Sequence, residues 1–104
     1  MRPKTNGKLK LFIDSSDNQK TIIKIGDFSL VENYDQPSQQ KILTVIDKLL
    51  KQRKLAINQI GQITVNTGPG SYTGLRVGCA VANALAWGLG IKVNGKKSVE
   101  PKYE

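Results

Sequence analysis

The chain has 104 residues, enough to bury one modest core but not two. Its 38% hydrophobic and 23% charged residues are typical of a soluble globular protein and argue against a disordered one. Cys79 is the only cysteine and histidine is absent, which excludes an internal disulfide, a histidine or multi-cysteine metal site, and catalysis by a histidine base. The net charge of +8 permits a nucleic-acid partner, although a lysine-rich solvated surface is the preferred explanation.

The first third of the chain predicts three antiparallel strands. Leu9, Leu11 and Ile13 alternate with their neighbours in a first strand that ends at Asp14. Residues 21–25 and 28–32 then flank Gly26-Asp27, a two-residue hairpin turn.

Helical periodicity begins after Pro37, where Ser38 is a candidate N-cap. The predicted helix runs to about Arg53, with one apolar stripe made of Ile42, Val45, Ile46, Leu49 and Leu50. A short strand at 63–65, a helix over 71–89 and a last strand at 91–94 complete the pattern, followed by a loose tail.

The resulting order is β-β-β-α-β-α-β, which predicts an α/β fold with a mixed sheet flanked by helices. This order matches the ribonuclease H-like half-domain of the actin, sugar-kinase and Hsp70 superfamily. We divide the chain into a basic N-terminal tail (1–8), a single lobe (9–95) and a polar C-terminal tail (96–104). The basic start leads into no apolar signal core and no membrane span is apparent, so we expect a cytoplasmic protein.

A glycine-rich turn joins the short strand to the second helix. Gly68 and Gly70 surround a proline, and Ser71 opens the helix, so the turn could receive an anion at free backbone amides. Neither known phosphate motif fits, because the Walker spacing is absent and the Rossmann spacing places Thr73 where glycine is needed.

Small residues recur along the second helix at Gly74, Gly78, Ala82 and Ala86, and Arg76 is the only charge between Pro69 and Ile91. Glycine within a helix costs about 1 kcal/mol relative to alanine, so close approach of another backbone is the expected compensation. Two interpretations remain open: an interface with a partner chain, or a central helix buried within one domain.

The run from Thr67 to Gly78, TGPGSYTGLRVG, with an alanine-rich helix ending at Gly90, resembles the signature of the TsaB (YeaZ) family. Weaker similarity extends from about Leu9 to Val99, in a short, single-lobe form that we expect to be natural. The resemblance implies a non-catalytic subunit that pairs with a TsaD-type transferase, or with itself when alone, to make threonylcarbamoyladenosine on tRNA. It implies a TsaE-type ATPase as a further partner through the complex, indirect contact with tRNA, and no membrane.

The resemblance also implies which residues form the partner interface. These are Ser71, Tyr72, Gly74, Leu75, Arg76, Gly78, Cys79, Ala82 and Ala86. Asp14, Ser15 and Ser16 resemble a vestigial phosphate-loop turn and are interpreted as structural, since the superfamily cleft lies between two lobes. We therefore expect no catalytic residue, no metal and no cofactor on the chain alone, and a nucleotide only in the complex.

Two other functions compete with this one. A basic tRNA-binding module acting without the dimer would bind in a steeply salt-dependent way. A small anion- or nucleotide-binding enzyme at Gly68–Ser71 would need a nearby acid, yet no acidic residue lies between Asp47 and Glu100.

Overall fold

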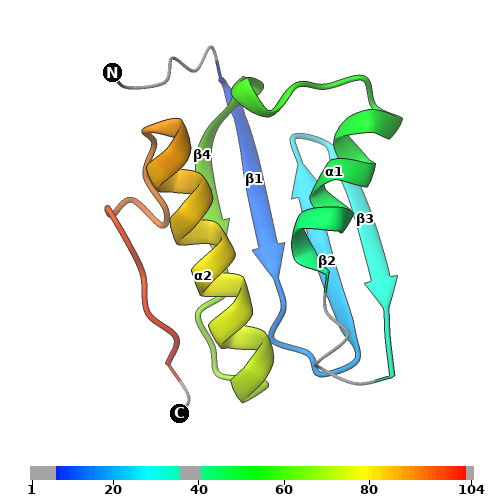
Figure 1. The fold of residues 1–104 in the computed structure, drawn as a ribbon, viewed down its shortest axis with the longest axis vertical. Helices are drawn as coiled ribbons and strands as arrows, with labels where there is room; N and C mark the ends of the chain where they lie inside the picture. Colours follow the sequence, from blue (N-terminus) through cyan, green and yellow to red (C-terminus); the bar gives the residue numbers. More distant parts are fainter. Residues whose placement is uncertain (1–6, 36–40, 103–104) are drawn as a thin grey trace.

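Four strands form a mixed sheet in the computed structural model, which describes residues 7–35 and 41–102 (Figure 1). They are β1 (Leu9–Asp14), β2 (Lys20–Ile25), β3 (Phe28–Asn33) and β4 (Ile60–Val65), in the spatial order β3-β2-β1-β4. The first three pair antiparallel, and β4 lies parallel to β1, with Leu11 opposite Ile63 and Ile13 opposite Val65. The predicted meander and crossover are therefore confirmed.

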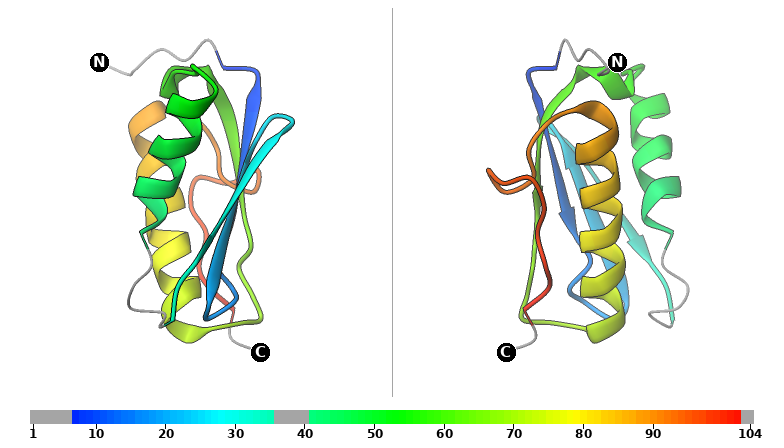
Figure 2. Two further views of the ribbon diagram at one scale, coloured as in Figure 1. Left: turned by 90° about the vertical axis from the view of Figure 1, so that its right-hand side faces the viewer. Right: turned by 60° about the vertical axis from the view of Figure 1, so that its left-hand side comes forward.

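Both long helices cover the same face of this sheet (Figure 2). They are α1 (Ile42–Gln52) and α2 (Tyr72–Leu89), and a short 3-10 turn, η2 (Ile57–Gln59), precedes β4. The apolar stripe of α1 is buried as predicted, from Ile42 to Leu50. The predicted cap at Ser38 falls outside the described residues.

The core lies between the sheet and the helical layer. Alternate strand residues, including Leu11, Ile13, Ile23 and Ile25, point into it and are fully buried. This alternation follows from the pleat, which sends successive side chains to opposite faces. The opposite face carries no helix in the described chain.

The segment after α2 differs from the prediction of a strand at 91–94. Gly90 ends α2 in the left-handed conformation (φ 70°), and only Val93 bridges to Ile63 of β4. The side chain of Asn94 makes the hydrogen bonds to Val65 that the backbone of a longer strand would have made. Its Oδ1 accepts from Val65 N (2.9 Å) and its Nδ2 donates to Val65 O (3.1 Å). The prediction of a full strand at 91–94 is therefore wrong, although Val93 and Asn94 still cover the edge of β4.

The tail also differs from its predicted loose form as far as Lys102. The backbone of Val99 exchanges two hydrogen bonds of 2.9 Å with the side chain of Asn83 on α2. Lys102 N donates to Thr67 O at 2.6 Å. These contacts fix residues 96–102 along α2 and the end of β4.

Candidate partner interface

The glycine-rich turn docks against the end of β1. Ser71 N donates to Ser16 O (2.7 Å), and a Cβ on Gly70 would lie 2.6 Å from Ser16 Cβ, so only glycine fits there. Ser71 caps α2 as predicted, with its Oγ accepting from Gly74 N (3.2 Å). Gly68 N donates to Asn66 Oδ1 (2.9 Å). Of the predicted anion-binding amides, those of Gly68 and Ser71 are therefore engaged within the chain.

The predicted vestigial turn forms a polar cluster at the carboxyl ends of β1 and β4. Asp14 Oδ1 accepts from Ser16 N (3.0 Å), Ser16 Oγ (2.6 Å) and Asn66 Nδ2 (3.2 Å). Ser15 is fully buried, and its Oγ donates to Gly74 O of α2 at 2.7 Å. These contacts are what structural turn residues make. Asn66 was not predicted here, although a polar residue directly after a buried parallel strand was its signal.

The ridge of small residues on α2 faces the inside of its own chain. Gly74, Gly78, Ala82 and Ala86 are all buried. A Cβ on Gly78 would lie 2.1 Å from Ser15 Oγ and 3.7 Å from Val65 Cγ2. We expected the backbone of a partner chain to pack closely against this ridge. That expectation is corrected, because the ridge packs against the end of β1 and against β4 instead. The alternative of a helix buried within one domain describes this side of α2.

Two larger residues predicted for the interface share the buried side. Leu75 and Cys79 are 0% and 2% exposed, so a partner cannot reach them while the fold is intact. Burial raises the pKa of the Cys79 thiol, since desolvation disfavours the thiolate. Ser71 is half-buried, which leaves Tyr72 and Arg76 as the predicted interface residues that are exposed.

The solvent side of α2 is the surface that remains for a partner. We define the outer face of α2 as Tyr72, Thr73, Arg76, Ala80, Ala84 and Trp87, all exposed. Trp87 is 86% exposed and Tyr72 is 59% exposed. Arg76 donates from Nη1 to Tyr72 Oη (3.2 Å), with its guanidinium 5.4 Å from the ring centre. A hollow of about 320 Å³ lies at the N-terminal half of this face.

The sequence prediction missed the small residues and the tryptophan of this face. Ala80, Ala84 and Trp87 follow Arg76 at intervals of three and four residues, so they share its side of the helix. The absence of charges along 77–91 was the available signal, but most of the predicted interface residues were taken from the buried side of the helix.

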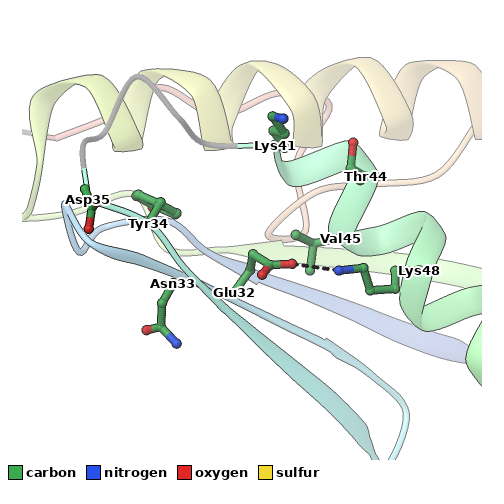
Figure 3. Close-up of a pocket in the computed structure, with 8 residues that line it drawn as sticks. All are labelled: Glu32, Asn33, Tyr34, Asp35, Lys41, Thr44, Val45 and Lys48. Atoms are coloured by element: carbon green, nitrogen blue, oxygen red, sulfur yellow. Dashed lines mark hydrogen bonds and ion pairs between the residues drawn. The ribbon is translucent and has the colours of Figure 1, made fainter.

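A larger hollow of about 850 Å³ lies between the end of β3 and the start of α1 (Figure 3). Its ionic contact joins Lys48 Nζ to Glu32 Oε1 at 2.9 Å, so this carboxylate already has a partner. The described residues that line it include no cysteine or histidine: Glu32, Asn33, Tyr34, Asp35, Lys41, Thr44, Val45 and Lys48. We therefore place no candidate site here.

Searches of the described ranges, 7–35 and 41–102, give two further observations. Nowhere in them do three acidic, cysteine or histidine side chains gather as metal ligands would. None of their helices combines the length and the apolarity that crossing a membrane requires.

Comparison with known proteins identifies the family. The family model for TsaD, tRNA N6-adenosine threonylcarbamoyltransferase, matches residues 32–100. The tRNA threonylcarbamoyladenosine biosynthesis protein TsaB of Haemophilus influenzae is 41% identical over 54 residues, which are 52% of this chain and 23% of that protein. An uncharacterized MG208 homologue of Mycoplasma pneumoniae is 38% identical over 82 residues, covering 72% of this chain and 41% of that protein.

The fold gives the same result. The structure of YeaZ from Pseudomonas aeruginosa superposes with a TM-score of 0.70 at 25% identity, covering 82% of this chain and 41% of that one. The chain thus spans less than half the length of these relatives. Its sheet and helices form the α/β, ribonuclease H-like fold expected from their order. Because the TsaD model matches more than half of the chain, we conclude that the chain belongs to the family which that model describes, and the TsaB-named relatives and the shared YeaZ fold support its place in the TsaB/YeaZ group.

Proposed function

We propose that this chain is a non-catalytic partner subunit in the synthesis of threonylcarbamoyladenosine on tRNA. It docks through the outer face of α2 onto a TsaD-type transferase, or onto a second copy of itself when alone. The observation that carries the proposal is that face, on which Tyr72 and Trp87 are exposed and Arg76 is the only charge. The relatives named for threonylcarbamoyladenosine biosynthesis supply the process.

The composition of this face supports a protein partner. Tryptophan, tyrosine and arginine are the residues that most often carry binding energy at protein interfaces. Ala80 and Ala84 lie between these larger side chains and leave room for a second helix to approach. A helix of a small domain would ordinarily show charges on its solvent side, and this one shows Arg76 alone.

The absence of catalysis is part of the proposal. Two side chains that could serve as nucleophiles, Ser15 and Cys79, are buried, and the raised pKa of the thiol favours its neutral form. A nucleotide and the TsaE-type ATPase enter only with the assembled complex in the cytoplasm.

Light scattering behind a sizing column tests the proposal on the chain mixed with the TsaD-type subunit of the same genome. We expect a stoichiometric complex that Ala80→Arg abolishes, because an arginine there fills the centre of the outer face. Gln62→Arg is the matched control, since it adds the same charge to an exposed position on the opposite side of the sheet. A chain that ignores the partner, or a complex that survives Ala80→Arg, refutes the interface.

Gly78→Arg would be a poor probe of this surface. Gly78 is buried against Ser15, so its replacement would unfold the chain rather than block a partner. Ala80→Arg avoids this difficulty, and an unchanged thermal midpoint of the isolated variant shows that the fold is retained.

A further inference from the structure

The face of the sheet opposite the helices is open in the described chain (Figure 2). Since Leu11, Ile13, Ile23 and Ile25 point to the helical layer, the residues between them point the other way. We define the open face as the strand residues on that side: Lys10, Phe12 and Asp14 of β1; Lys20, Ile22 and Lys24 of β2; Ser29, Val31 and Asn33 of β3; and Gln62 and Thr64 of β4.

The strand register brings separate parts of the sequence together on this face. Thr64, Phe12, Lys24 and Ser29 form one cross-strand row, because Phe12 is opposite both Thr64 and Lys24, and Lys24 is opposite Ser29. Lys20 lies opposite Asn33, and Lys10 opposite Gln62. Each lysine is thus next to an uncharged side chain that can form hydrogen bonds.

No described carboxylate balances these lysines in a salt bridge. The two described salt bridges, Lys48–Glu32 and Lys51–Asp47, both involve α1 on the other side of the sheet. Asp14, at the end of β1, accepts three hydrogen bonds through Oδ1 within the turn cluster. Lys24 contacts the Phe12 ring instead, with Nζ 5.6 Å from its centre. The field over the open face is therefore positive.

We propose that the open face binds the sugar-phosphate backbone of RNA. Lys20 and Lys24 are four residues apart on β2, a separation of about 13 Å. This is several times the axial spacing of phosphates, about 3.4 Å along one strand, so each lysine can meet a different phosphate. The proposal deepens the proposed function by giving the subunit a direct contact with RNA, and it requires no contact through α2.

The apolar residues of the open face favour RNA over an acidic protein helix. Phe12 and Ile22 are half-buried, and the Phe12 ring is partly covered by Lys24. Val31, 47% exposed, is therefore the one exposed apolar side chain of the open face, which is too little to anchor a helix. Because Lys24 covers it, the Phe12 ring is not free to stack on a base. We therefore expect sequence-independent binding dominated by phosphate contacts, with a steep dependence on salt.

The test is fluorescence anisotropy of the full chain with a labelled, unmodified tRNA transcript over a series of salt concentrations. The open-face variant is Lys10→Gln/Lys20→Gln/Lys24→Gln. The control, Lys41→Gln/Lys48→Gln/Lys51→Gln, removes the same charge from α1 on the other side. We expect the open-face variant to lose at least tenfold in affinity at moderate salt, and its slope of log affinity against log salt to be shallower by about 2 to 3. We expect the control to lose less than threefold.

Three results overturn the proposal: no binding at low salt, equal losses in both variants, or undiminished binding by the open-face variant. Lys10→Arg/Lys20→Arg/Lys24→Arg must bind like the parent chain, which separates loss of charge from loss of fold. Complex formation with the TsaD-type subunit is measured in parallel. An open-face variant that still forms that complex but loses RNA supports this inference by itself, and one that binds RNA but loses the complex shows that the face docks protein instead.

Discussion

At the scale of single residues, the contact between Ser15 and Gly78 determines how closely α2 approaches the sheet. Ser15 Oγ donates to Gly74 O at 2.7 Å and occupies the space in which a side chain on Gly78 would lie. Glycine in the helix costs about 1 kcal/mol relative to alanine, and the buried hydrogen bond and the close packing that it allows offset this cost.

We expect Gly78→Ala to lower the free energy of unfolding by about 1 to 3 kcal/mol, the usual effect of overpacking. Ser15→Ala/Gly78→Ala should lose less than the two single variants together, because the remaining Ser15 Cβ lies 3.4 Å from the new methyl. The matched control is Gly88→Ala in the same helix. No atom lies within 4 Å of its Cβ position, so this variant should be unchanged or up to about 1 kcal/mol more stable. Urea denaturation measures all four, and a Gly78→Ala variant as stable as the parent would refute the argument.

Cys79 gives a second prediction at this scale, through pH. Its folded-state pKa is raised by burial, so the thiol stays neutral in the folded chain above the ordinary value of about 8.5, where the unfolded chain ionises. This contribution to stability is complete below that pH and is lost as the pH rises, by at most about 1.4 kcal/mol per pH unit. The difference in unfolding free energy between the parent and Cys79→Ala should therefore shrink between pH 8 and pH 10. A constant difference would contradict it.

At the scale of elements, the edge of β4 depends on one asparagine. Asn94 adopts a left-handed backbone (φ 51°) and forms two hydrogen bonds to Val65, which a regular strand would have supplied from its backbone. Asparagine tolerates this conformation better than most residues.

Two substitutions separate the backbone effect from the hydrogen bonds. Asn94→Gly keeps the conformation but removes the hydrogen bonds, so we expect a loss of about 1 to 2 kcal/mol. Asn94→Ala also places a side chain in a left-handed conformation, and we expect a further loss of about 1 kcal/mol. Thermal unfolding of the two variants measures the difference. If Asn94→Ala were the more stable, the backbone would not be the constraint proposed here.

The elements that the sequence predicted are those with strong local signals. The stripe from Ile42 to Leu50 predicted α1, and Gly26-Asp27 predicted the hairpin, because each depends on neighbouring residues. The end of the chain was mispredicted because the pairing of Val93 and Asn94 depends on the distant edge of β4. The buried side of α2 was assigned to a partner chain, because the sequence does not show that α2 packs against Ser15. These two segments are far apart in the chain, and no sequence pattern predicts that they are in contact.

At the scale of the whole molecule, the two proposed surfaces lie on opposite sides of the sheet. The outer face of α2 lies on the solvent side of the helical layer, because its residues are exposed. The open face lies on the side of the sheet that carries no helix in the described chain (Figure 2). Buried glycines and alanines let α2 pack closely on the sheet. The two surfaces are therefore separated by two layers only, the helix α2 and the sheet. Lys10, Lys20 and Lys24 do not stand out as a group in the sequence, because only the strand register brings them onto one face.

This separation predicts that the transferase-type subunit and RNA bind at the same time. The affinity for RNA should be unchanged within about twofold in Ala80→Arg, and the open-face lysine variant should retain the protein complex. Lysine acetylation followed by mass spectrometry checks the geometry. RNA should protect Lys10, Lys20 and Lys24, whereas the protein partner should leave these three reactive and reduce the quenching of Trp87 fluorescence by iodide, since that side chain is 86% exposed in the free chain. If RNA displaces the protein subunit from the chain, the two partners compete for one surface, and the assignment of separate faces is wrong.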